Sequence, residues 1–282
     1  MFVSENWKDY EVLDTAAGEK LERWGNVILR RPDPQVIWKE PYDKSIWKRA
    51  DGFYHRSRSG GGKWEFFKKL PDRWTISYKN LKFYVRPTGF KHTGLFPEQA
   101  VNWDYIMEKT SGRKNPKVLN LFAYTGGATL AAAAGGADVV HVDASKGMVS
   151  WAKENVALSS LSDRYVRFIV DDCEKFVKRE IKRGHFYDGI IMDPPSYGRG
   201  PGGEMWKMED KIYDLVKSTA PLLTDNPLFF IINSYTTGLQ PTVIKNIITL
   251  ALGCRAEADE IGLPVTSSGI CLPCGATGRA IF

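Results

Sequence analysis

The chain has 282 residues, of which 43% are hydrophobic and 26% charged, with a formal net charge of +6. This composition is close to that of an average soluble globular protein, and it excludes a wholly disordered chain, a collagen-like repeat and a coiled coil. A membrane-spanning helix needs about 20 apolar residues. The longest strand-like apolar run, 228–232, is far shorter. Because the first residues lack a signal-peptide pattern and only four cysteines are present, we expect a cytoplasmic protein with reduced thiols.

The positive charge is concentrated in the first third of the chain. Residues 44–91 hold 13 Lys and Arg against three Asp and Glu, and seven of the nine tryptophans lie within the first 103 residues. Such a segment is typical of a domain that binds a polyanion, although the solvated surface of a small β domain would look the same. We therefore predict two domains, a basic, aromatic-rich β domain over 1–95 and a second domain over 96–282.

The first hundred residues are predicted to form β structure. Short strands are expected at 27–29 and 36–38, on either side of a proline-rich turn. The apolar and β-branched segments 74–78 and 81–85 predict a hairpin, in whose two-residue turn Asn80 tolerates a positive φ.

From about residue 100 onward, short apolar runs alternate with helical stretches. Predicted strands are 117–122, 139–142, 165–170, 187–192 and 228–233, and predicted helices are 126–135, 145–158, 173–184, 208–223 and 241–252, with edge strands after 254. This alternation predicts an α/β fold in which a parallel sheet carries helices on both faces. Since ligands of such sheets bind at the carboxyl ends of the strands, the residues after each strand are the candidate functional residues.

The first predicted strand leads into a turn with two glycines, Gly126 and Gly127, in the sequence Leu-Asn-Leu-Phe-Ala-Tyr-Thr-Gly-Gly. The turn lacks the G-x-G-x-x-G pattern, which disfavours a nicotinamide dehydrogenase. The glycines let the backbone approach an anionic group at a helix N-terminus, or they serve only to make the turn.

Acidic residues follow the second and third predicted strands. Asp143 can accept hydrogen bonds from ribose hydroxyls, or it can cap the helix that follows. Asp172 can accept from the amine of an adenine while the N–H of Cys173 serves a ring nitrogen, or Asp172 can cap its own helix. Both acids therefore have a functional and a structural interpretation.

The most specific feature follows the fourth predicted strand, in the sequence Asp193-Pro194-Pro195-Ser196-Tyr197. Two prolines fix φ and remove two N–H donors, which leaves carbonyl acceptors beside a carboxylate. Such a corner suits an amine or the edge of a planar base, and the ring of Tyr197 offers a face on which a base can stack. The glycine-rich loop 198–203, predicted to lack regular structure, could close over a substrate.

Together these motifs resemble the S-adenosylmethionine (SAM) site of a class I methyltransferase. Segments 119–127, 143–145, 171–172 and 193–196 are similar to the bacterial family that methylates large-subunit ribosomal RNA, which includes 5-methylcytosine and 7-methylguanine enzymes. Segment 93–99 resembles the stretch just before the catalytic domain of that family. The resemblance covers roughly residues 75–282 and implies SAM as cofactor and a Rossmann-like sheet with helices on both faces, preceded by a small β domain.

The resemblance also implies a role for individual residues. The implied cofactor-binding residues are Gln99, Phe122, Ala123, Tyr124, Thr125, Gly126, Asp143, Ala144, Ser145, Asp172 and Cys173. The implied catalytic residues are Asp193, Pro194 and Pro195, and the implied substrate-binding residues are Ser196 and Tyr197. No metal is expected.

One departure from the family concerns the atom that accepts the methyl group. In the 5-methylcytosine members, a cysteine after the fifth strand attacks the base, because C5 of a pyrimidine is not nucleophilic until an adduct forms. This chain has Asn233-Ser234-Tyr235 at that position, so a nitrogen acceptor is favoured over cytosine C5. Cys271 and Cys274 are interpreted as structural, since a single C-x-x-C is weak evidence for zinc.

The expected partner is RNA, as ribosomal RNA or a precursor of a ribosomal subunit, and no membrane is expected. The alternatives are a methyltransferase that acts on protein, DNA or a small molecule, and a non-catalytic RNA-binding protein on the same scaffold. The basic segment 44–91 favours a nucleic acid, and the intact run 193–196 favours an active enzyme.

Overall fold

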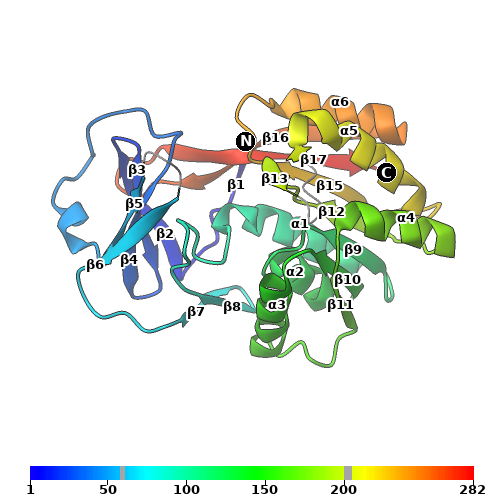
Figure 1. Cartoon of the computed structure of the whole chain (residues 1–282), viewed down its shortest axis with the longest axis horizontal. Helices are drawn as coiled ribbons and strands as arrows, with labels where there is room; N and C mark the ends of the chain where they lie inside the picture. The colour runs from blue at the N-terminus through cyan, green and yellow to red at the C-terminus, as the bar shows by residue number, and fades with distance from the viewer. Residues whose placement is uncertain (58–60, 200–204) are drawn as a thin grey trace. The chain divides into compact units, whose positions relative to one another are not determined.

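The computed structural model describes residues 1–57, 61–199 and 205–282 (Figure 1). Its backbone contacts divide the chain into two compact units. The N-terminal unit comprises residues 2–100 and 262–274, and the large unit comprises Met1, 101–261 and 275–282.

A mixed sheet forms the centre of the large unit. Its strands are β9 (Lys117–Leu121), β10 (Asp138–Asp143), β11 (Val166–Val170), β12 (Gly189–Met192), β15 (Phe229–Ser234), β16 (Arg255–Pro264) and β17 (Cys271–Ile281). They are seven of the eight strands that this sheet has in the described ranges and lie in the order β16-β17-β15-β12-β9-β10-β11; the eighth is the two-residue strand β1 (Phe2–Val3). The five strands β9 to β12 and β15 run parallel, and β17 pairs with β15 in the antiparallel sense. The carboxyl ends of the five parallel strands therefore meet at one edge of the sheet.

Helices cover both faces of this sheet. They are α1 (Ala100–Ser111), α2 (Gly127–Ala134), α3 (Lys146–Leu158), α4 (Cys173–Arg183), α5 (Met208–Thr219) and α6 (Pro241–Leu252), with the short 3-10 helix η3 (Ala220–Leu222) after α5. Figure 1 shows α5 and α6 on one side of the strands and α2 and α3 on the other. None of the helices in the described ranges is long and apolar enough to cross a membrane.

Alternation along β9 explains why both faces are covered. Leu119 and Leu121 pack with Phe176 of α4 and Val216 of α5 in one hydrophobic core. Successive strand side chains point to opposite faces, and Asn120 accordingly donates from Nδ2 to Oγ1 of Thr129 in α2, at 2.9 Å. The sheet is thus buried on both sides, as in doubly wound α/β folds.

The N-terminal unit consists mainly of antiparallel strand pairs, with one parallel pair in its larger sheet. Its strands are β1 (Phe2–Val3), β2 (Tyr10–Ala16), β3 (Glu19–Trp24), β4 (Val27–Pro32), β5 (Gly52–Arg56), β6 (Gly62–Phe66), β7 (Trp74–Tyr78) and β8 (Leu81–Val85), and its 3-10 helices are η1 (Ile46–Arg49) and η2 (Pro97–Gln99). Strands β2 to β6 form a five-stranded sheet in sequential order, and β7 and β8 form a two-stranded one.

Two local predictions for this unit are wrong. Residues 36–38 do not form a strand; the carbonyls of Val36 and Trp38 instead accept single hydrogen bonds from Gly18 and Ala17. The hairpin β7–β8 is confirmed, but its positive φ of 52° belongs to Lys79 and not to Asn80.

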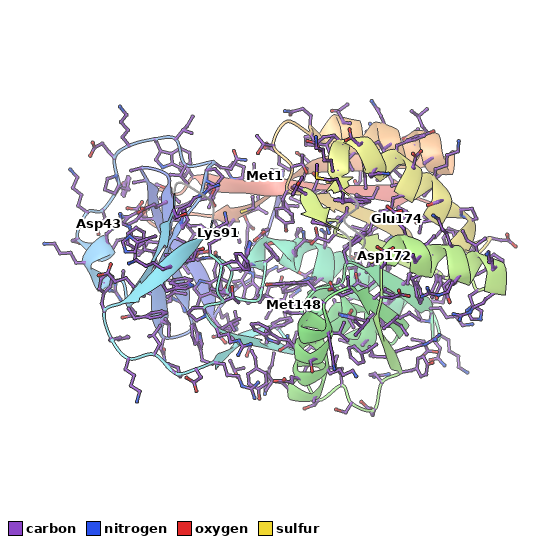
Figure 2. All side chains as sticks on the ribbon, in the orientation of Figure 1. Met1, Asp43, Lys91, Met148, Asp172 and Glu174 are labelled. Carbon is purple, nitrogen blue, oxygen red and sulfur yellow. The ribbon has the colours of Figure 1, made fainter. Side chains whose placement is uncertain are left out.

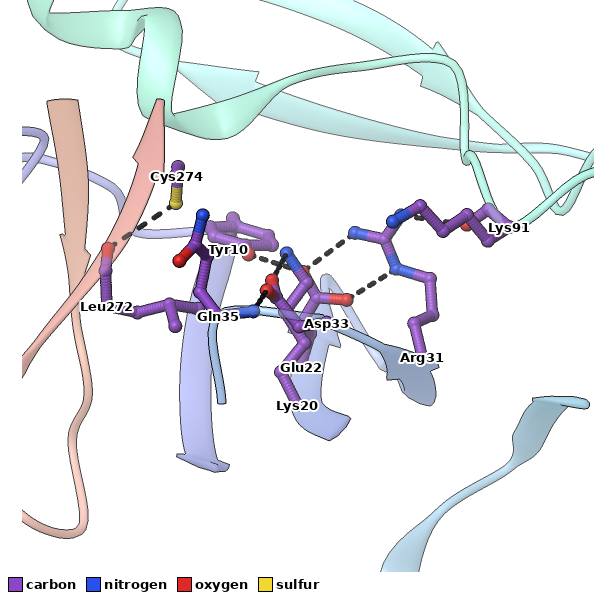
Figure 3. Close-up of polar contacts among 9 residues, drawn as sticks. All are labelled: Tyr10, Lys20, Glu22, Arg31, Asp33, Gln35, Lys91, Leu272 and Cys274. Carbon is purple, nitrogen blue, oxygen red and sulfur yellow. Dashed lines mark hydrogen bonds and ion pairs between the residues drawn. The ribbon is translucent and has the colours of Figure 1, made fainter. Parts of the chain in front are cut away.

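A cluster of buried charged side chains connects β2, β3 and β4 (Figure 3). Arg31 donates from Nε and Nη2 to the two carboxylate oxygens of Glu22, at 2.6 and 2.8 Å, and Tyr10 donates its hydroxyl to the same carboxylate at 2.6 Å. Lys20 lies 3.5 Å from Glu22 and 3.2 Å from Asp33. Burial opposes ionisation of Glu22, but the nearby cations and hydrogen bonds outweigh it and lower the pKa of Glu22 to about 2.

The same arginine holds the chain segment that leads into η2. Nη1 of Arg31 donates to the carbonyl of Lys91 at 2.9 Å (Figure 3). Arg31 therefore joins the sheet of the N-terminal unit to residue 91, two residues before the segment 93–99 that the sequence singled out.

Candidate active site

The turn after β9 has an unusual backbone conformation. Phe122, Tyr124 and Gly126 have φ values of 54°, 50° and 90°. Such values are uncommon for residues other than glycine and cost on the order of 1–3 kcal/mol each, so the surrounding structure must hold them. The N–H of Phe122 donates to Sγ of Cys173 at 3.3 Å, and the N–H of Ala123 donates to the carbonyl of Val142 at 3.0 Å.

The glycines of this turn allow neighbouring elements to pack closely against it. Gly126 is the N-cap of α2, and a Cβ on Gly127 would lie 2.6 Å from the ring of Trp103 in α1. Because α2 begins directly after this turn, its first backbone N–H groups lie at the carboxyl edge of the sheet. The turn therefore offers donors for an anionic group where the ligand of such a sheet binds.

Asp143 connects this turn to the turn after β10. Its carboxylate accepts from the N–H of Tyr124 at 2.9 Å and from the N–H of Ser145 at 2.8 Å. Burial raises the pKa of Asp143, and the two hydrogen bonds only partly offset this effect. Ser145 itself caps α3 by accepting from the N–H of Met148 at 3.4 Å, so Asp143 is not the helix cap.

The acids after β11 have mainly local partners. Asp172 caps α4 by accepting from the N–H of Lys175 at 2.9 Å, which confirms the structural interpretation of one of its oxygens. Asp171 forms an ion pair with Arg179 of α4, and its N–H donates to the carbonyl of Asp143 at 3.1 Å. Figure 2 shows Met148 at the start of α3, and Asp172 and Glu174 at the start of α4.

Cys173 has a structural role, because its sulfur accepts a hydrogen bond from the turn after β9. The side chain is buried in the core between the sheet and α4, and burial raises the pKa of its thiol far above the ordinary value. A thiol in this state is not a nucleophile. Its part in the site is to accept the hydrogen bond from Phe122 that holds the turn after β9.

The corner after β12 is held by the two elements beside it. The N–H of Asp193 donates to the carbonyl of Leu121 at 3.4 Å, which places Asp193 next to the turn after β9. Pro194 is buried, whereas Pro195 is exposed. The Pro195 carbonyl accepts from Nε1 of Trp206 at 2.6 Å, so this acceptor is already used within the protein.

Trp206 is a site residue that the sequence analysis missed. Its ring centroid lies 5.8 Å from that of Phe122 at an angle of 44°, and it bonds the Pro195 carbonyl as well. It thereby contacts both the turn after β9 and the corner after β12. No local pattern marks it; the only hint is a tryptophan three residues after the glycine-rich segment 198–203.

A hairpin follows the corner where the sequence predicted an irregular loop. Strands β13 (Tyr197–Arg199) and β14 (Met205–Lys207) pair in the antiparallel sense. The prediction of an irregular loop is therefore wrong for 198–199. The rest of the predicted loop, 200–203, lies outside the described residues. Tyr197 is 53% exposed and its hydroxyl donates to Sδ of Met205 at 2.8 Å. An open hollow is lined by Ser196, Tyr197, Lys207, Glu209, Asp210, Tyr235, Thr236 and Thr237.

The carboxyl end of β15 holds a buried serine. Ser234 donates from Oγ to Sδ of Met208 at 3.4 Å and accepts from the N–H of Thr236 at 3.2 Å. Asn233, also buried, accepts from Nδ2 of Asn102 at 3.0 Å. These side chains have structural partners, and neither has the chemistry of a thiol nucleophile.

The remaining predicted residues belong to other parts of the chain. Gln99 is buried in η2 of the N-terminal unit, so its cofactor contact stays a prediction. Cys274 also lies in that unit, where burial raises the pKa of its thiol. Among the described residues, no three His, Cys, Asp or Glu side chains are grouped as a metal site would need.

Hydrogen bonds thus join the motifs that follow β9, β10, β11 and β12 into one connected edge. This edge fits the expected cofactor in three respects. It offers backbone donors at the start of α2, a carboxylate at Asp143 that still has acceptor capacity, and the second oxygen of Asp172, which has no hydrogen bond among the described residues. The set suits the carboxylate, ribose hydroxyls and amine of SAM.

Comparisons with known proteins bear on the identity of this edge. A family model of S-adenosylmethionine-dependent methyltransferases matches residues 30–229. The crystal structure of a SAM-dependent methyltransferase from Agrobacterium tumefaciens is similar over 99% of this chain and 92% of that chain, with a TM-score of 0.92 and 32% sequence identity.

Curated relatives match a shorter segment. Ribosomal RNA large subunit methyltransferase K/L of Shewanella sp. (strain MR-4) is 37% identical over 163 residues, which are 56% of this chain and 22% of that protein. The same protein of Shewanella oneidensis is 37% identical over 162 residues, 56% of this chain and 21% of that protein. The match thus spans about a fifth of the length of these relatives. The family model and the structural likeness over 99% of the chain agree with the connected edge of the sheet. The chain therefore belongs to the S-adenosylmethionine-dependent methyltransferase family and is an enzyme that uses SAM as methyl donor.

Proposed function

We propose that this methyltransferase transfers the methyl group of SAM to a nitrogen atom of a base in ribosomal RNA. The observation that carries the proposal is the corner Asp193–Ser196, which adjoins the turn after β9 through the hydrogen bond from Asp193 to Leu121. The relatives named for large-subunit ribosomal RNA and the basic segment 44–91 support RNA as the substrate.

SAM would be held by the residues of the connected edge. Backbone groups of Phe122, Ala123, Tyr124, Thr125 and Gly126 would bind the methionine moiety, Asp143 with Ala144 and Ser145 the ribose, and Asp172 with the N–H of Cys173 the adenine; Gln99 completes the proposed set. When bound, SAM supplies an electrophilic methyl group on its sulfonium.

The chemistry left to the protein is mainly positioning. Asp193 would orient the acceptor base and receive its proton, with the Pro194 carbonyl beside it, and Ser196 and Tyr197 would contact the base. Alignment of nucleophile, methyl group and sulfur can supply about 7–11 kcal/mol in favourable cases. A nitrogen acceptor is supported by the buried serine at the end of β15, because methylation of cytosine C5 needs a nucleophile that Ser234, bonded to Met208, does not provide.

The RNA would be bound by the basic β domain, which we place at 1–95, ahead of the catalytic domain at 96–282. Phe66 and Phe67 are exposed in that domain and precede two exposed lysines, Lys68 and Lys69. The rings of Trp64 and Phe66 stack with centroids 5.8 Å apart. Exposed aromatic rings among basic residues suit unpaired bases and their phosphates.

The deciding experiment combines labelled SAM with ribosomal RNA or subunits from cells that lack this gene, followed by nucleoside mass spectrometry. We expect label on a base nitrogen, and we expect Asp193→Ala to lower the transfer rate by about 10²–10⁴-fold, the usual contribution of a positioned proton acceptor, while SAM still binds. Label at cytosine C5 would overturn the nitrogen acceptor. Full activity of Asp193→Ala would overturn the role of that residue, and absence of label despite SAM binding would favour a protein or small-molecule substrate.

A further inference from the structure

A second hollow lies in the large unit, at the end of the sheet opposite to the candidate active site. It has a volume of about 510 Å³, within the range of roughly 300–1,000 Å³ that is usual for ligand sites. Lys117, Asp138 and Arg167, which line it, belong to the first residues of β9, β10 and β11. Because these strands run parallel, their amino ends meet here, away from the connected edge.

Two aromatic rings line this hollow and are largely exposed. Tyr165, just before β11, is 61% exposed, and Phe186, between α4 and β12, is 52% exposed. A single exposed aromatic residue needs no explanation. Two such rings at one hollow, beside basic side chains, form the pattern that proteins use to stack unpaired bases.

Two basic side chains that line the hollow have no acidic partner within ion-pair distance among the described residues. Lys117 and Arg167 are exposed, and neither forms an ion pair in the part of the chain that the structure describes. Asp188, in contrast, already accepts from Nη1 of Arg113 at 2.9 Å and from the N–H of Lys117 at 2.8 Å. The two uncompensated cations can therefore bind a phosphate.

One acidic group of the hollow is also open to a ligand. Asp138 is half-buried, and its carboxylate accepts no hydrogen bond in the described ranges, although its own N–H donates to the carbonyl of Pro116 at 2.9 Å. A carboxylate in this state can accept from the exocyclic amine of a base. The hollow thus combines stacking surfaces, phosphate-binding cations and a hydrogen-bond acceptor.

The wall of the hollow is held rigid by a buried carboxylate. Glu180 of α4 accepts from the hydroxyl of Tyr187 at 2.6 Å, from Nδ1 of His185 at 2.8 Å and from Nη1 of Arg183 at 2.9 Å. Burial alone would raise the pKa of Glu180, but these hydrogen bonds lower it, so the group stays charged and bonded. Since Phe186 lies between two of these partners, its backbone is fixed before a ligand binds, which lowers the entropy lost on binding.

We propose that this hollow binds an unpaired nucleotide of the RNA substrate, with the base against Tyr165 and Phe186 and its phosphate at Lys117 and Arg167. The proposal rests on the proposed function, because it takes the substrate to be RNA. It adds a second RNA-binding surface on the large unit, separate from the basic β domain and from the edge where the methyl group is transferred. A free nucleotide has the same chemistry, and the experiment separates the two.

The test uses the full-length protein and a fluorescein-labelled single-stranded oligoribonucleotide, with the dissociation constant measured by anisotropy at several salt concentrations. For Tyr165→Ala/Phe186→Ala we expect binding about tenfold weaker, since stacking contributes about 1–3 kcal/mol per base. For Lys117→Gln/Arg167→Gln we expect the slope of log affinity against log salt to fall by about 0.7 for each phosphate that the protein no longer neutralises. Melting curves and SAM affinity should match those of the unmodified protein.

The matched control is Lys245→Gln/Leu250→Ala, which removes an exposed cation and an exposed apolar side chain from α6. This variant should bind the oligoribonucleotide like the unmodified protein. Unchanged affinity in both hollow variants would overturn the proposal, as would equally tight binding of a free mononucleotide. If ribosomal RNA is methylated but the hollow variants behave like the control, only this inference fails. If the hollow variants weaken RNA binding but no RNA is methylated, only the proposed function fails.

Discussion

The strand ends at the candidate active site of the large unit and the sheet of the N-terminal unit hold their polar groups in different ways. In the large unit, short side chains and backbone groups at the ends of parallel strands bond one another, as Asp143 does with the N–H groups of Tyr124 and Ser145. In the N-terminal unit, full charges are buried against one another, as Glu22 is against Arg31 and Lys20. The first arrangement leaves hydrogen-bond acceptors available for a ligand. In the second, the charged groups are bonded to one another and only stabilise the fold.

This difference predicts where a polar substitution acts. Removal of one member of a buried ion pair leaves an uncompensated charge, so in the N-terminal unit the loss should be one of stability. Removal of a group at the strand ends should weaken ligand binding or transfer and leave the fold intact. The following predictions test this contrast, from the largest expected effect to the smallest.

The substitution Arg31→Met should have the largest effect on stability. It removes both hydrogen bonds to the buried carboxylate of Glu22 and the one to the Lys91 carbonyl, and breaking a buried pair from one side costs about 3–5 kcal/mol. Chemical denaturation measures the loss. The double variant Arg31→Met/Glu22→Leu should recover much of it, because no buried charge is left unpaired. If Arg31→Met is as stable as the unmodified protein, the contrast between the strand ends and the N-terminal sheet is wrong.

The same pair predicts a dependence of stability on pH. The pKa of Glu22 falls from its ordinary value of 4.5 in the unfolded chain to about 2 in the fold. Its contribution to stability is therefore complete above pH 4.5 and is lost as the pH falls towards 2. The free energy of unfolding should fall over this interval in the unmodified protein. It should fall less steeply in Arg31→Met/Glu22→Leu, and parallel curves would contradict the assignment.

The substitution Asp143→Asn should act on cofactor binding. An amide cannot accept from both the Tyr124 and the Ser145 N–H groups, and it loses the charge that would strengthen bonds to ribose hydroxyls. Because a hydrogen bond to a charged group contributes about 1.5–3 kcal/mol, SAM affinity should fall about 10- to 150-fold in calorimetry. The control Asp163→Asn, at an exposed position after α3, should bind SAM normally. A large drop in stability with normal SAM affinity would place Asp143 with the structural carboxylates instead.

The smallest effect is expected for Trp206→Phe. This change keeps an aromatic ring against Phe122 but removes the hydrogen bond to the Pro195 carbonyl. A neutral hydrogen bond contributes about 0.5–1.5 kcal/mol, so the transfer rate should fall by at most about tenfold while SAM affinity stays the same. Tyr213→Phe, on the exposed surface of α5, is the matched control and should leave the rate unchanged. Loss of SAM affinity would show that Trp206 supports the turn after β9 more than the corner.

Local sequence determined most of the large unit. The five predicted helices and the five predicted parallel strands are all present, because each has an apolar pattern of its own and clear boundaries, such as Ser145 as the N-cap of α3 and Gly184 after α4. The residues after the strands could be found in the same way, since a parallel sheet brings strand ends together whatever the details of packing. That is why Asp143 and Asp193 are predictable from the sequence alone.

Only the tertiary structure decided which partner each of these residues has. Asp172 and Asp143 look alike in sequence, yet one caps its helix and the other joins two turns. The Pro195 carbonyl, expected to be an acceptor for a ligand, is bonded by Trp206, which lies in a hairpin that no local pattern predicts. In the N-terminal unit, the pairing of Glu22 with Arg31 comes from the register of β3 and β4. Strand periodicity and helix caps are short-range and can be read along the chain, whereas register and side-chain partners depend on how distant segments pack.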